Sequence, residues 1–478
     1  MDVDRVAHDA VIVGGGLAGL ACAVALAESG LRPLVLERTG ELGGRARSWR
    51  HAATGDQVDI GPHVVHSEYA NFLAFLERLG TRDRITWQPR RLITIATTPP
   101  TVLRHRPLPA PLSLLPDLVR APGLTRRDLW SNNPPTWRAL KFGEEDVAEL
   151  DRVAALEYLR AAGVSEHMID WFWRFAAMVV MNVPLEHCSS AALLRVHAQL
   201  IGRRGIHFGF PAAGLSELYV PQADRLIRAA GGEVLCNAEA VRLESDAVQL
   251  ADGRRIAARF CVLALPPQNL ARLAPRLADT AAFAPSPYIS TYLWLDRKIT
   301  AERFWALPWS GERLNYDFYD LTAIRPGWET RPTVIATNAI YALRATGMDD
   351  DAVVRATLAE LALFAPEAAH ARVVHADVHR IPMGICQPQP GTEAKRPPTR
   401  TSRPRVFLAG DWTRTALPSS MESAVRSGFL AAEALLADLG RARRFSQDVR
   451  PRDGLAGLVR AATVAARALG PVLARARA

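Results

Sequence analysis

The sequence predicts an α/β fold in which a parallel sheet is interrupted by a second unit of antiparallel strands and helices. Three observations support this prediction. Residues 10–36 read as a strand, a small-residue helix and a second strand, which is a βαβ opening. Residues 288–340 hold three strand candidates in succession, as expected for an antiparallel sheet. Near the end, a strand (405–411) and a helix (420–438) return to the opening pattern.

The segments between these parts are less regular. Residues 98–123 contain seven prolines interleaved with leucines and are expected to be neither helix nor strand. The chain to about residue 200 reads as mostly helical, and short strands follow that turn at Asp252-Gly253. A helix is expected near 349–363 and a loop at 382–404. One aromatic group within the helical part belongs either to a helical core or to the lining of an apolar cavity: Trp171, Phe172, Trp173 and Phe175.

Composition narrows the class of protein. A hydrophobic content of 49% and a charged content of 22% are typical of a globular protein. The five cysteines are scattered without metal-ligand spacing, which indicates a reducing compartment and no metal site. We find neither a secretory leader nor 18 continuous apolar residues, so we expect a cytoplasmic protein. The net charge of +9 suits an anionic partner. Because no nucleic-acid-binding motif is present, a membrane surface fits better than nucleic acid.

Gly14, Gly16 and Gly19 form the pattern G-x-G-x-x-G between the first strand and the first helix. The first glycine permits a tight turn, the second lets a pyrophosphate approach the backbone, and the third lets the helix sit close to the strand. Glu37 lies 23 residues after Gly14, at the end of the second strand, where its carboxylate can accept ribose hydroxyls. These features predict a dinucleotide site.

A second glycine pair, Gly43-Gly44, follows directly and precedes Arg45. This glycine pair would let the backbone approach the nucleotide a second time, with Arg45 as a charged contact. An NAD site does not require these features. The segment "GGGLAGL…VLERTGELGGRARS" resembles the GG-doublet flavoproteins, the superfamily of amine oxidases and carotenoid desaturases, and "RVFLAGDWTRTALPSSMESAVRSGFLAAEALL" resembles the closing FAD motif of that superfamily. The resemblance implies an FAD-dependent oxidoreductase with a Rossmann-like FAD-binding domain and an interleaved α+β substrate domain of antiparallel sheet plus helices.

The resemblance also assigns residues. Asp411 is expected to bind the ribityl chain, and the helix after it to point its N-terminus at the flavin, where the helix dipole stabilises the reduced anion. Ser420, Met421 and Glu422 open that helix; the Glu422 side chain could equally cap it. Trp412 packs either beside the flavin or in the core. We assign the following neighbouring residues to the same cofactor-binding set: Leu17, Ala18, Arg38, Gly61, Pro62, His63, Val241 and Gly410.

The segment "DIGPH" resembles the part of the superfamily that passes the isoalloxazine ring. It would bring Asp59, Gly61 and His63 to the reactive face. His63 is the candidate for moving a proton beside hydride transfer, with an ordinary structural histidine as the alternative. His66 is a weaker candidate.

Two features separate the branches of the superfamily. Amine oxidases carry a lysine where this chain has Ser290, and aromatic residues in the loop that corresponds to 380–404, which has none. By contrast "YLWLDRKI", "PQPG" and the closing motif resemble plant-type phytoene desaturases and the squalene-associated FAD enzymes of hopanoid pathways, such as hydroxysqualene dehydroxylase. The resemblance therefore implies hydride transfer from phytoene or a squalene-type lipid to flavin N5, with quinone or oxygen as the electron acceptor. A flavin amine oxidase is the alternative, and a flavoprotein without turnover a more remote one.

Such a substrate dissolves in a bilayer, so we expect a peripheral membrane protein on the inner face. The proline-leucine segment, with Arg104, Arg106 and Arg120, is one candidate dock. The tail is the other: at helical spacing, one face carries Leu455, Leu458, Val459, Ala462, Leu469 and Leu473, and away from it lie Arg460, Arg467 and Arg475. A frayed tail, kinked at Pro471, is the alternative.

The order of these patterns divides the chain into six segments. Residues 1–97, 205–280 and 391–438 are expected to build the FAD-binding domain. Residues 98–204 form a helical, membrane-facing part and 281–390 the sheet of the substrate domain, and 439–478 are the basic amphipathic tail.

Overall fold

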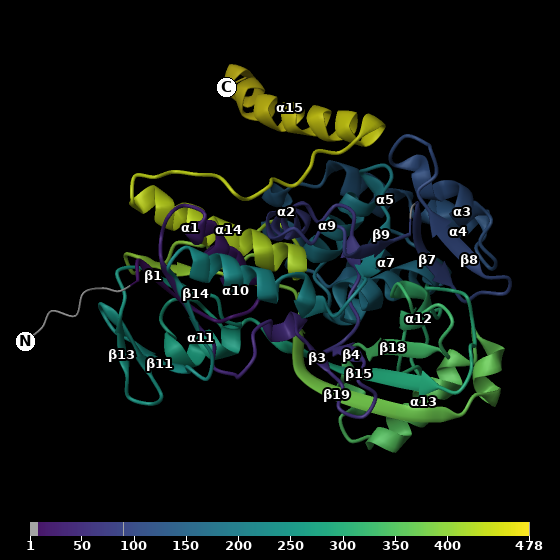
Figure 1. Ribbon diagram of the computed structural model, residues 1–478. Helices are drawn as coiled ribbons and strands as arrows, with labels where there is room; N and C mark the ends of the chain where they lie inside the picture. Colours follow the sequence, from purple (N-terminus) through teal and green to yellow (C-terminus); the bar gives the residue numbers. More distant parts are fainter. Residues whose placement is uncertain (1–7, 89, 478) are drawn as a thin grey trace, which may run out of the picture.

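The computed structural model describes residues 8–88 and 90–477, and the side chains up to residue 469 (Figure 1). A five-stranded parallel sheet, in the order β10-β2-β1-β14-β20, unites three distant parts of the chain. Its strands are β1 (Ala10–Val13), β2 (Pro33–Leu36), β10 (Glu233–Leu235), β14 (Cys261–Leu263) and β20 (Val406–Leu408). Four of the five are buried along their whole length, as expected for a parallel sheet covered on both faces. The predicted α/β class is confirmed.

Helix α1 (Leu17–Ala27) is buried at every position and lies against α14 (Met421–Asp438). The two helices approach so closely that a Cβ on Gly428 would be 2.2 Å from the carbonyl oxygen of Ala18. This is why both helices are rich in small residues. Two further helices cover the same core, α2 (Ala70–Leu79) and α10 (Val220–Ala229). The packing holds the start of α14 and the glycine turn before α1 in one rigid unit.

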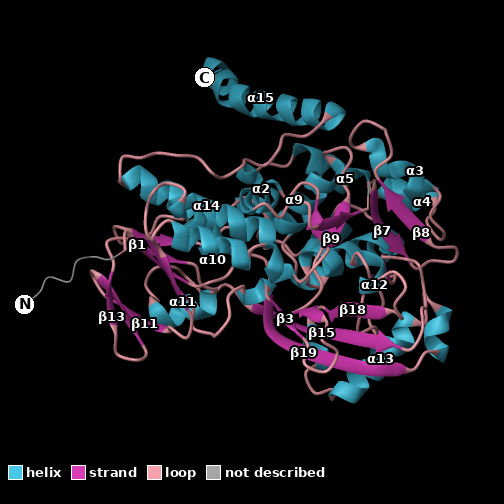
Figure 2. Cartoon of the chain, in the orientation of Figure 1, coloured by secondary structure: helices cyan, strands magenta, loops and turns pink. Residues whose placement is uncertain are grey.

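A seven-stranded sheet forms the second unit, in the order β19-β15-β18-β17-β16-β7-β8 (Figure 2). Only the β16–β7 pair is parallel. The strands are β7 (Arg91–Ile95), β8 (Thr101–Arg104), β15 (Pro285–Leu295), β16 (Phe304–Ala306), β17 (Asp317–Asp320), β18 (Val334–Ala339) and β19 (Val373–Cys386). Helices α12 (Leu321–Ile324) and α13 (Asp350–Leu361) belong to this unit.

Two predictions of irregular structure were wrong in part. Within 98–123 the chain forms β8 and, after a short 3-10 turn, helix α3 (Leu115–Val119). Within 382–404, the first residues continue β19. In both places the proline-rich sequence is tolerated because β8 and β19 are the two edge strands of the sheet. Strand β7, placed by the sequence in the first FAD segment, also joins this sheet.

The predicted helical region contains seven α-helices: α3, α4 (Arg126–Ser131), α5 (Asn133–Lys141), α6 (Val147–Leu150), α7 (Ala155–Ala161), α8 (Glu166–Met168) and α9 (Ser190–Ile201). Two π-helical turns, Ile169–Arg174 and Ala177–Met181, interrupt it. All four residues of the aromatic group pack in apolar core clusters. Phe172 and Trp173 are in the helical core, whereas Phe175 joins the apolar cluster against the seven-stranded sheet.

Three smaller sheets complete the fold. An antiparallel meander of β11 (Ala240–Leu243), β12 (Ala247–Leu250) and β13 (Arg255–Ala257) follows β10, with its second turn at Gly253 as predicted. Strands β3 (Ser48–Arg50) and β4 (Gln57–Asp59) pair with each other. Strand β9 (Phe208–Pro211) pairs with β5 (Val65–His66) and β6 (Ile85–Trp87). Helix α11 (Pro267–Leu273) follows the parallel strand β14.

Helix α15 (Gly454–Arg477) lies across one side of the molecule, next to α5 (Figure 1). Arg460 and Arg467 lie away from the exposed leucines, as the helical spacing predicts, but they face the body of the protein. Arg460 and Arg467 both pair with Glu145, at 2.8 and 2.5 Å, and thereby hold the helix to the body. Leu473, Arg475 and Pro471 lie outside the described side chains. Among the described residues, no helix has the length and apolar character needed to cross a bilayer.

Candidate functional site: a dinucleotide cradle facing an antiparallel sheet

The glycine turn after β1 is built as its spacing predicts. Gly14 has a φ of +112°, and its N–H donates to the carbonyl of Leu36 on the neighbouring strand. A Cβ on Gly19 would be 1.9 Å from the carbonyl oxygen of Gly14, so only glycine lets the helix come this close. A Cβ on Gly16 would meet nothing nearer than 3.9 Å. Gly16 thus faces open space, and the first turn of α1, with Leu17 and Ala18, carries no side-chain cap.

Glu37 follows β2 and is directed at this turn. Its Oε2 accepts from the N–H of Gly15 at 2.9 Å, and its Oε1 accepts from the N–H and Oγ1 of Thr39, each at 2.9 Å. These contacts fix both oxygens at the carboxyl edge of the parallel sheet, where a ribose would lie. The adjacent Arg38 side chain is exposed.

The second glycine pair closes over the first. The N–H of Gly43 donates to the carbonyl of Gly15 at 2.9 Å, and Gly43 and Gly44 have φ values of +109° and +57°. Both conformations favour glycine. The backbone at this second glycine pair therefore lies against the glycine turn that follows β1.

Arg45 joins the two ends of the sequence. Its guanidinium donates to Asp411 at 2.6 Å and to the carbonyl of Gly384 at 3.1 Å. Burial by itself would lower the pKa of Arg45, but the Asp411 carboxylate outweighs it and raises the pKa. Asp411 comes directly after β20 and Gly410, so the two predicted FAD motifs meet in one buried ion pair.

The start of α14 corrects one prediction and refines another. Ser420 is the N-cap, because its hydroxyl accepts from the N–H of Ser423 at 3.2 Å. Glu422 does not cap its own helix. Its carboxylate accepts instead from Asn71, through the backbone N–H at 3.0 Å and the amide at 2.7 Å, and from the N–H of Phe72 at 2.8 Å, at the start of α2. The amides of Met421 and Glu422 remain at the helix N-terminus.

The segment 59–63 crosses the face of the seven-stranded sheet. A Cβ on Gly61 would be 2.8 Å from Oδ1 of Asn338 and 3.2 Å from Oγ of Ser290. Asn338 also donates to the carbonyl of Pro62 at 3.2 Å. Gly61 is required because the loop lies directly on two side chains of the sheet.

Asp59 and His63 flank this glycine. Asp59 accepts from the N–H of Leu215 at 2.7 Å and lies 3.5 Å from Arg325; burial nevertheless raises its pKa. Nδ1 of His63 is 2.7 Å from the carbonyl of Gly61 and must be the donor, since a carbonyl only accepts. Burial lowers the pKa of His63, so the neutral ring offers Nε2 as a proton acceptor.

Three other sequence candidates lie elsewhere. His66 accepts from the N–H of Glu68 and stacks on Tyr69, and burial lowers its pKa to about 3, so its role is structural. Trp412 fills the core: its indole donates to the carbonyl of Leu265 at 2.9 Å. Val241 is 46% exposed on β11.

Sequence reasoning missed a buried ionic group behind Asp411. Glu393 bridges Arg195 of α9 and Arg396, and Arg396 donates to the carbonyl of Asp411 at 2.9 Å. Nothing in the local sequence signals this group, because its members come from separate parts of the chain.

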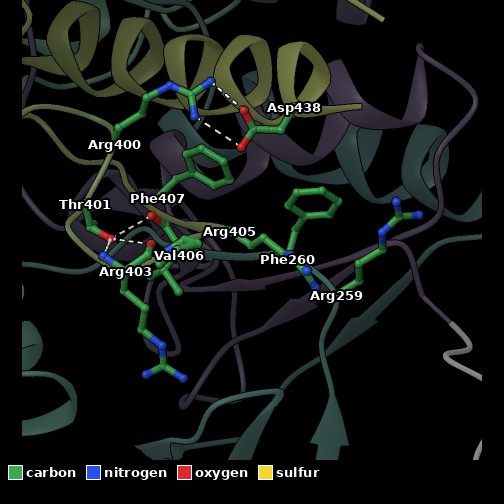
Figure 3. A pocket seen from close by; sticks show the side chains of 10 residues that line it. Arg259, Phe260, Arg400, Thr401, Arg403, Arg405, Val406, Phe407 and Asp438 are labelled. Atoms are coloured by element: carbon green, nitrogen blue, oxygen red, sulfur yellow. Dashed lines mark hydrogen bonds and ion pairs between the residues drawn. The ribbon is translucent and has the colours of Figure 1, made fainter. Parts of the chain in front are cut away.

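A surface pocket lies at the opposite edge of the parallel sheet (Figure 3). Its lining comes from the residues just before β14 and β20, from the first residues of β20 and from the end of α14: Arg259, Phe260, Arg400, Thr401, Arg403, Pro404, Arg405, Val406, Phe407 and Asp438. Ligands of such sheets bind at the carboxyl ends of the strands, so this pocket is not the dinucleotide site. In the part of the chain that the structure describes, no His, Cys, Asp or Glu group is placed to hold a metal ion.

The residues present fit FAD. The open space at Gly16, the uncapped N-terminus of α1, Glu37 and the Arg45–Asp411 pair form one continuous cradle. The model of the flavin containing amine oxidoreductase family matches residues 17–436. The chain belongs to this family. It is an FAD-dependent oxidoreductase.

Two relatives are similar to this chain over most of their length. The chain is 27% identical to 15-cis-phytoene desaturase of Synechococcus elongatus over 465 residues, covering 89% of this chain and 95% of that protein. It is 30% identical to carotenoid phi-ring synthase of Streptomyces griseus over 476 residues, covering 89% and 87%.

Solved structures of amine oxidases share the fold. Putrescine oxidase bound to putrescine superposes with a TM-score of 0.68 at 17% identity, covering 90% of this chain and 99% of that one. Cyclohexylamine oxidase of Brevibacterium oxydans gives 0.67 at 20% identity, covering 91% and 100%.

Proposed function

We propose that the protein is a desaturase or dehydrogenase that oxidises a long isoprenoid of the carotenoid class. The observation that carries this proposal is the apolar cluster on the sheet face next to the Gly61 loop. Its buried members include Phe175, Phe210, Tyr292, Phe304 and Tyr319. Such surroundings suit a hydrocarbon chain, which gains from leaving water and needs no polar partner. The names of the two carotenoid-related proteins support the same substrate class.

Bound FAD supplies hydride acceptance at N5, and the chain does the rest. The amides at the start of α1 would hold the diphosphate, Glu37 the ribose, and the Arg45–Asp411 pair the ribityl chain. The backbone N–H groups of Met421 and Glu422 would stabilise negative charge on the reduced flavin. The Gly61-Pro62 loop is held on the sheet by Asn338 and would line the flavin side of the substrate site.

Oxidation of a small amine is the second candidate. The amine oxidase neighbours share the fold alone, but one carboxylate on the sheet face, Asp317, makes no ion pair among the described residues and would suit an ammonium group. Against this, Ser290 stands where amine oxidases carry lysine. On β15, the Tyr292 hydroxyl accepts from the N–H of Asp59 and the Tyr288 ring packs on Gly384, so neither is free to cage an amine.

The experiment is anaerobic reduction of the flavin. The purified holoenzyme in liposomes is mixed with phytoene, other carotenoids, squalene or hydroxysqualene, and in parallel with putrescine and cyclohexylamine in buffer. We expect the oxidised flavin absorbance to bleach with a carotenoid. Bleaching by a squalene-type lipid alone would move the proposal to that class, and bleaching by an amine alone would overturn it.

We also propose that the protein draws its substrate from a membrane surface, on the inner face of the membrane. The outward face of α15 exposes Leu455, Leu458 and Leu469, with Leu458 67% exposed. Helix α4 exposes Trp130, which is 78% exposed, and α5, which lies beside α15, exposes Trp137. Leucine with interfacial tryptophan is the composition of a helix that lies in the headgroup region. A quinone dissolved in the same bilayer is the electron acceptor we expect.

Replacing both Leu455 and Leu458 by Asp is expected to release the protein from anionic liposomes in a flotation assay. Each side chain loses roughly 1.5–3 kcal/mol of apolar burial, which is a combined affinity loss of about 100-fold or more. Because both side chains are exposed, the thermal midpoint should not change. The double variant Glu312→Ala/Glu329→Ala, on the surface of the sheet unit, is the control that should still float. Unchanged flotation of the leucine variant would contradict this membrane surface.

A further inference from the structure

One row of side chains runs across the seven-stranded sheet beneath the Gly61 loop. In the register of the sheet, Ser290 on β15 is opposite Asn338 on β18, and Asn338 is opposite Asp317 on β17. Directly opposed residues share a face, so all three point to the side on which Gly61 lies. The next residue in the row is Ala306 on β16. Asp317 is therefore the last polar group before the apolar cluster begins.

Asp317 differs from the other buried carboxylates near it. Asp59 lies near Arg325, Asp411 is paired with Arg45, and Glu393 with two arginines. Asp317 is 3% exposed, and its only side-chain partner among the described residues is the hydroxyl of Tyr319, which donates to Oδ2 at 2.7 Å. Its Oδ1 has no hydrogen-bond partner there. A buried carboxylate without a charged partner lowers the stability of the folded protein. Groups of this kind are found most often at catalytic and binding sites.

The groups around Asp317 are neutral. Tyr319 lies on the same strand and stacks against Phe304, with ring centroids 4.7 Å apart. Tyr288, two residues before Ser290, presents a second hydroxyl without a partner on this face. Tyr69 is also near Tyr319. Of these phenols, only Tyr288 lies close enough to Arg45 and Asp411 for their charges to change its pKa. Burial raises the pKa of Asp317 to about 6.

We infer that Asp317 is the proton acceptor of the desaturation, an inference that rests on the proposed function. One carbon of the isoprenoid loses a hydride to the flavin, and the C–H bond on the neighbouring carbon breaks. The electron pair of that second bond forms the new double bond, and its proton passes to Oδ1 of Asp317. The lipid is oxidised by two electrons and the flavin is reduced by two. The carboxylic acid then returns its proton to solvent after product leaves.

This role predicts how turnover depends on pH. Only the carboxylate accepts a proton, so the rate of flavin reduction by substrate should rise with pH, with a midpoint of about 6. Stability should change in the opposite direction. Because the pKa of Asp317 is higher in the folded protein than in the unfolded chain, its contribution to stability is fully present at low pH and is lost as the pH rises through about 6.

The test is Asp317→Asn in the holoenzyme, with stopped-flow flavin reduction and thermal unfolding measured from pH 5 to 8.5. We expect reduction to slow by roughly 100-fold to 10,000-fold and to lose its midpoint near 6. At pH 8 the variant should melt about 2–4 °C higher than the wild type, and this difference should shrink as the pH is lowered to 5. The second readout needs no substrate, and FAD content and visible spectrum should be unchanged.

Two further variants sharpen the test. Tyr319→Phe removes the hydrogen bond from the Tyr319 hydroxyl to the carboxylate, so the pH midpoint of flavin reduction should move upward. Asp320→Asn is the matched control, because it lies on the same strand but on the other face, 3.3 Å from Lys298. Its flavin reduction should keep the wild-type pH profile.

The outcomes separate the two proposals. If wild type is reduced by a carotenoid and Asp317→Asn is reduced equally fast with the same midpoint, the inference fails and the proposed function stands. If wild type is reduced by an amine alone, both fail and Asp317 is the counter-ion of that amine. A wild type reduced by none of the substrates also overturns both.

Discussion

Gly16→Ala is expected to yield a folded protein that purifies without flavin. A Cβ at this position meets no protein atom within 3.9 Å, and the φ of −85° is accessible to alanine, so the apoprotein should melt where the wild-type apoprotein does. The same methyl group would occupy the space into which the pyrophosphate must come. A clash of about 3 kcal/mol lowers the affinity for FAD about 100-fold. Isothermal titration of the two apoproteins with FAD measures this directly.

Gly19→Ala is the matched comparison, three positions along the same motif. Its Cβ would be 1.9 Å from the carbonyl oxygen of Gly14, inside the protein itself. The helix must then move away from β1, which we expect to cost about 3 kcal/mol or more and to lower the melting temperature even without FAD. If Gly16→Ala kept its flavin with normal affinity, the diphosphate would not lie at Gly16, and the cradle described above would be wrong.

Glu393→Ala is expected to destabilise the protein by about 3–5 kcal/mol, because it leaves the buried Arg396 without a counter-charge and Arg195 with only the exposed Glu144. The Glu393 side chain is 1% exposed and holds Arg195 and Arg396 together. Arg396 also donates to the carbonyl of Asp411, so the loss should reach the flavin and weaken its retention. Denaturant unfolding and the flavin content after dialysis measure the two effects.

The control variant removes the other carboxylate that binds Arg195. Glu144 binds Arg195 at 2.7 Å but is 49% exposed, so Glu144→Ala should cost less than about 1 kcal/mol and leave flavin content unchanged. Equal effects of the two variants would show that burial of the Glu393 network is unimportant. The pKa of Glu393 is low because Arg396 and Arg195 outweigh the effect of burial. Its stabilisation is therefore lost as the pH falls through that value, and the wild type should lose more stability in acid than Glu393→Ala.

Parts of this protein were predictable from short stretches of sequence. The glycines at 14, 19, 43 and 44 reflect local needs of the backbone, either a positive φ or a close approach, that other residues do not meet. Gly16 was predictable because its missing side chain leaves room for a pyrophosphate. Glu37 was predictable because a parallel βαβ unit fixes where the second strand ends. The parallel sheet and its helices were predictable for the same reason, since buried strands and small-residue helices leave a local pattern.

Other parts depend on contacts between distant segments. Glu422 matched a capping pattern but serves α2, because the helices pack so that Asn71 and Phe72 present free N–H groups to it. Arg460 and Arg467 matched a basic membrane face but pair with Glu145, because α15 lies beside α5. In both cases the residues fit the local pattern, but their side chains bind a partner that is far away in the sequence.

The sequence by itself determined the cofactor, the class of fold and the position of the cradle, since each rests on backbone requirements written within a few residues. Only the tertiary structure decided that Arg45 meets Asp411 across 366 positions, and that Asp317 lies in one row with Asn338 and Ser290. The physical reason is that alternation along a strand shows which residues share a face, whereas the register between strands sets which side chains meet. That register is fixed by packing over the whole sheet.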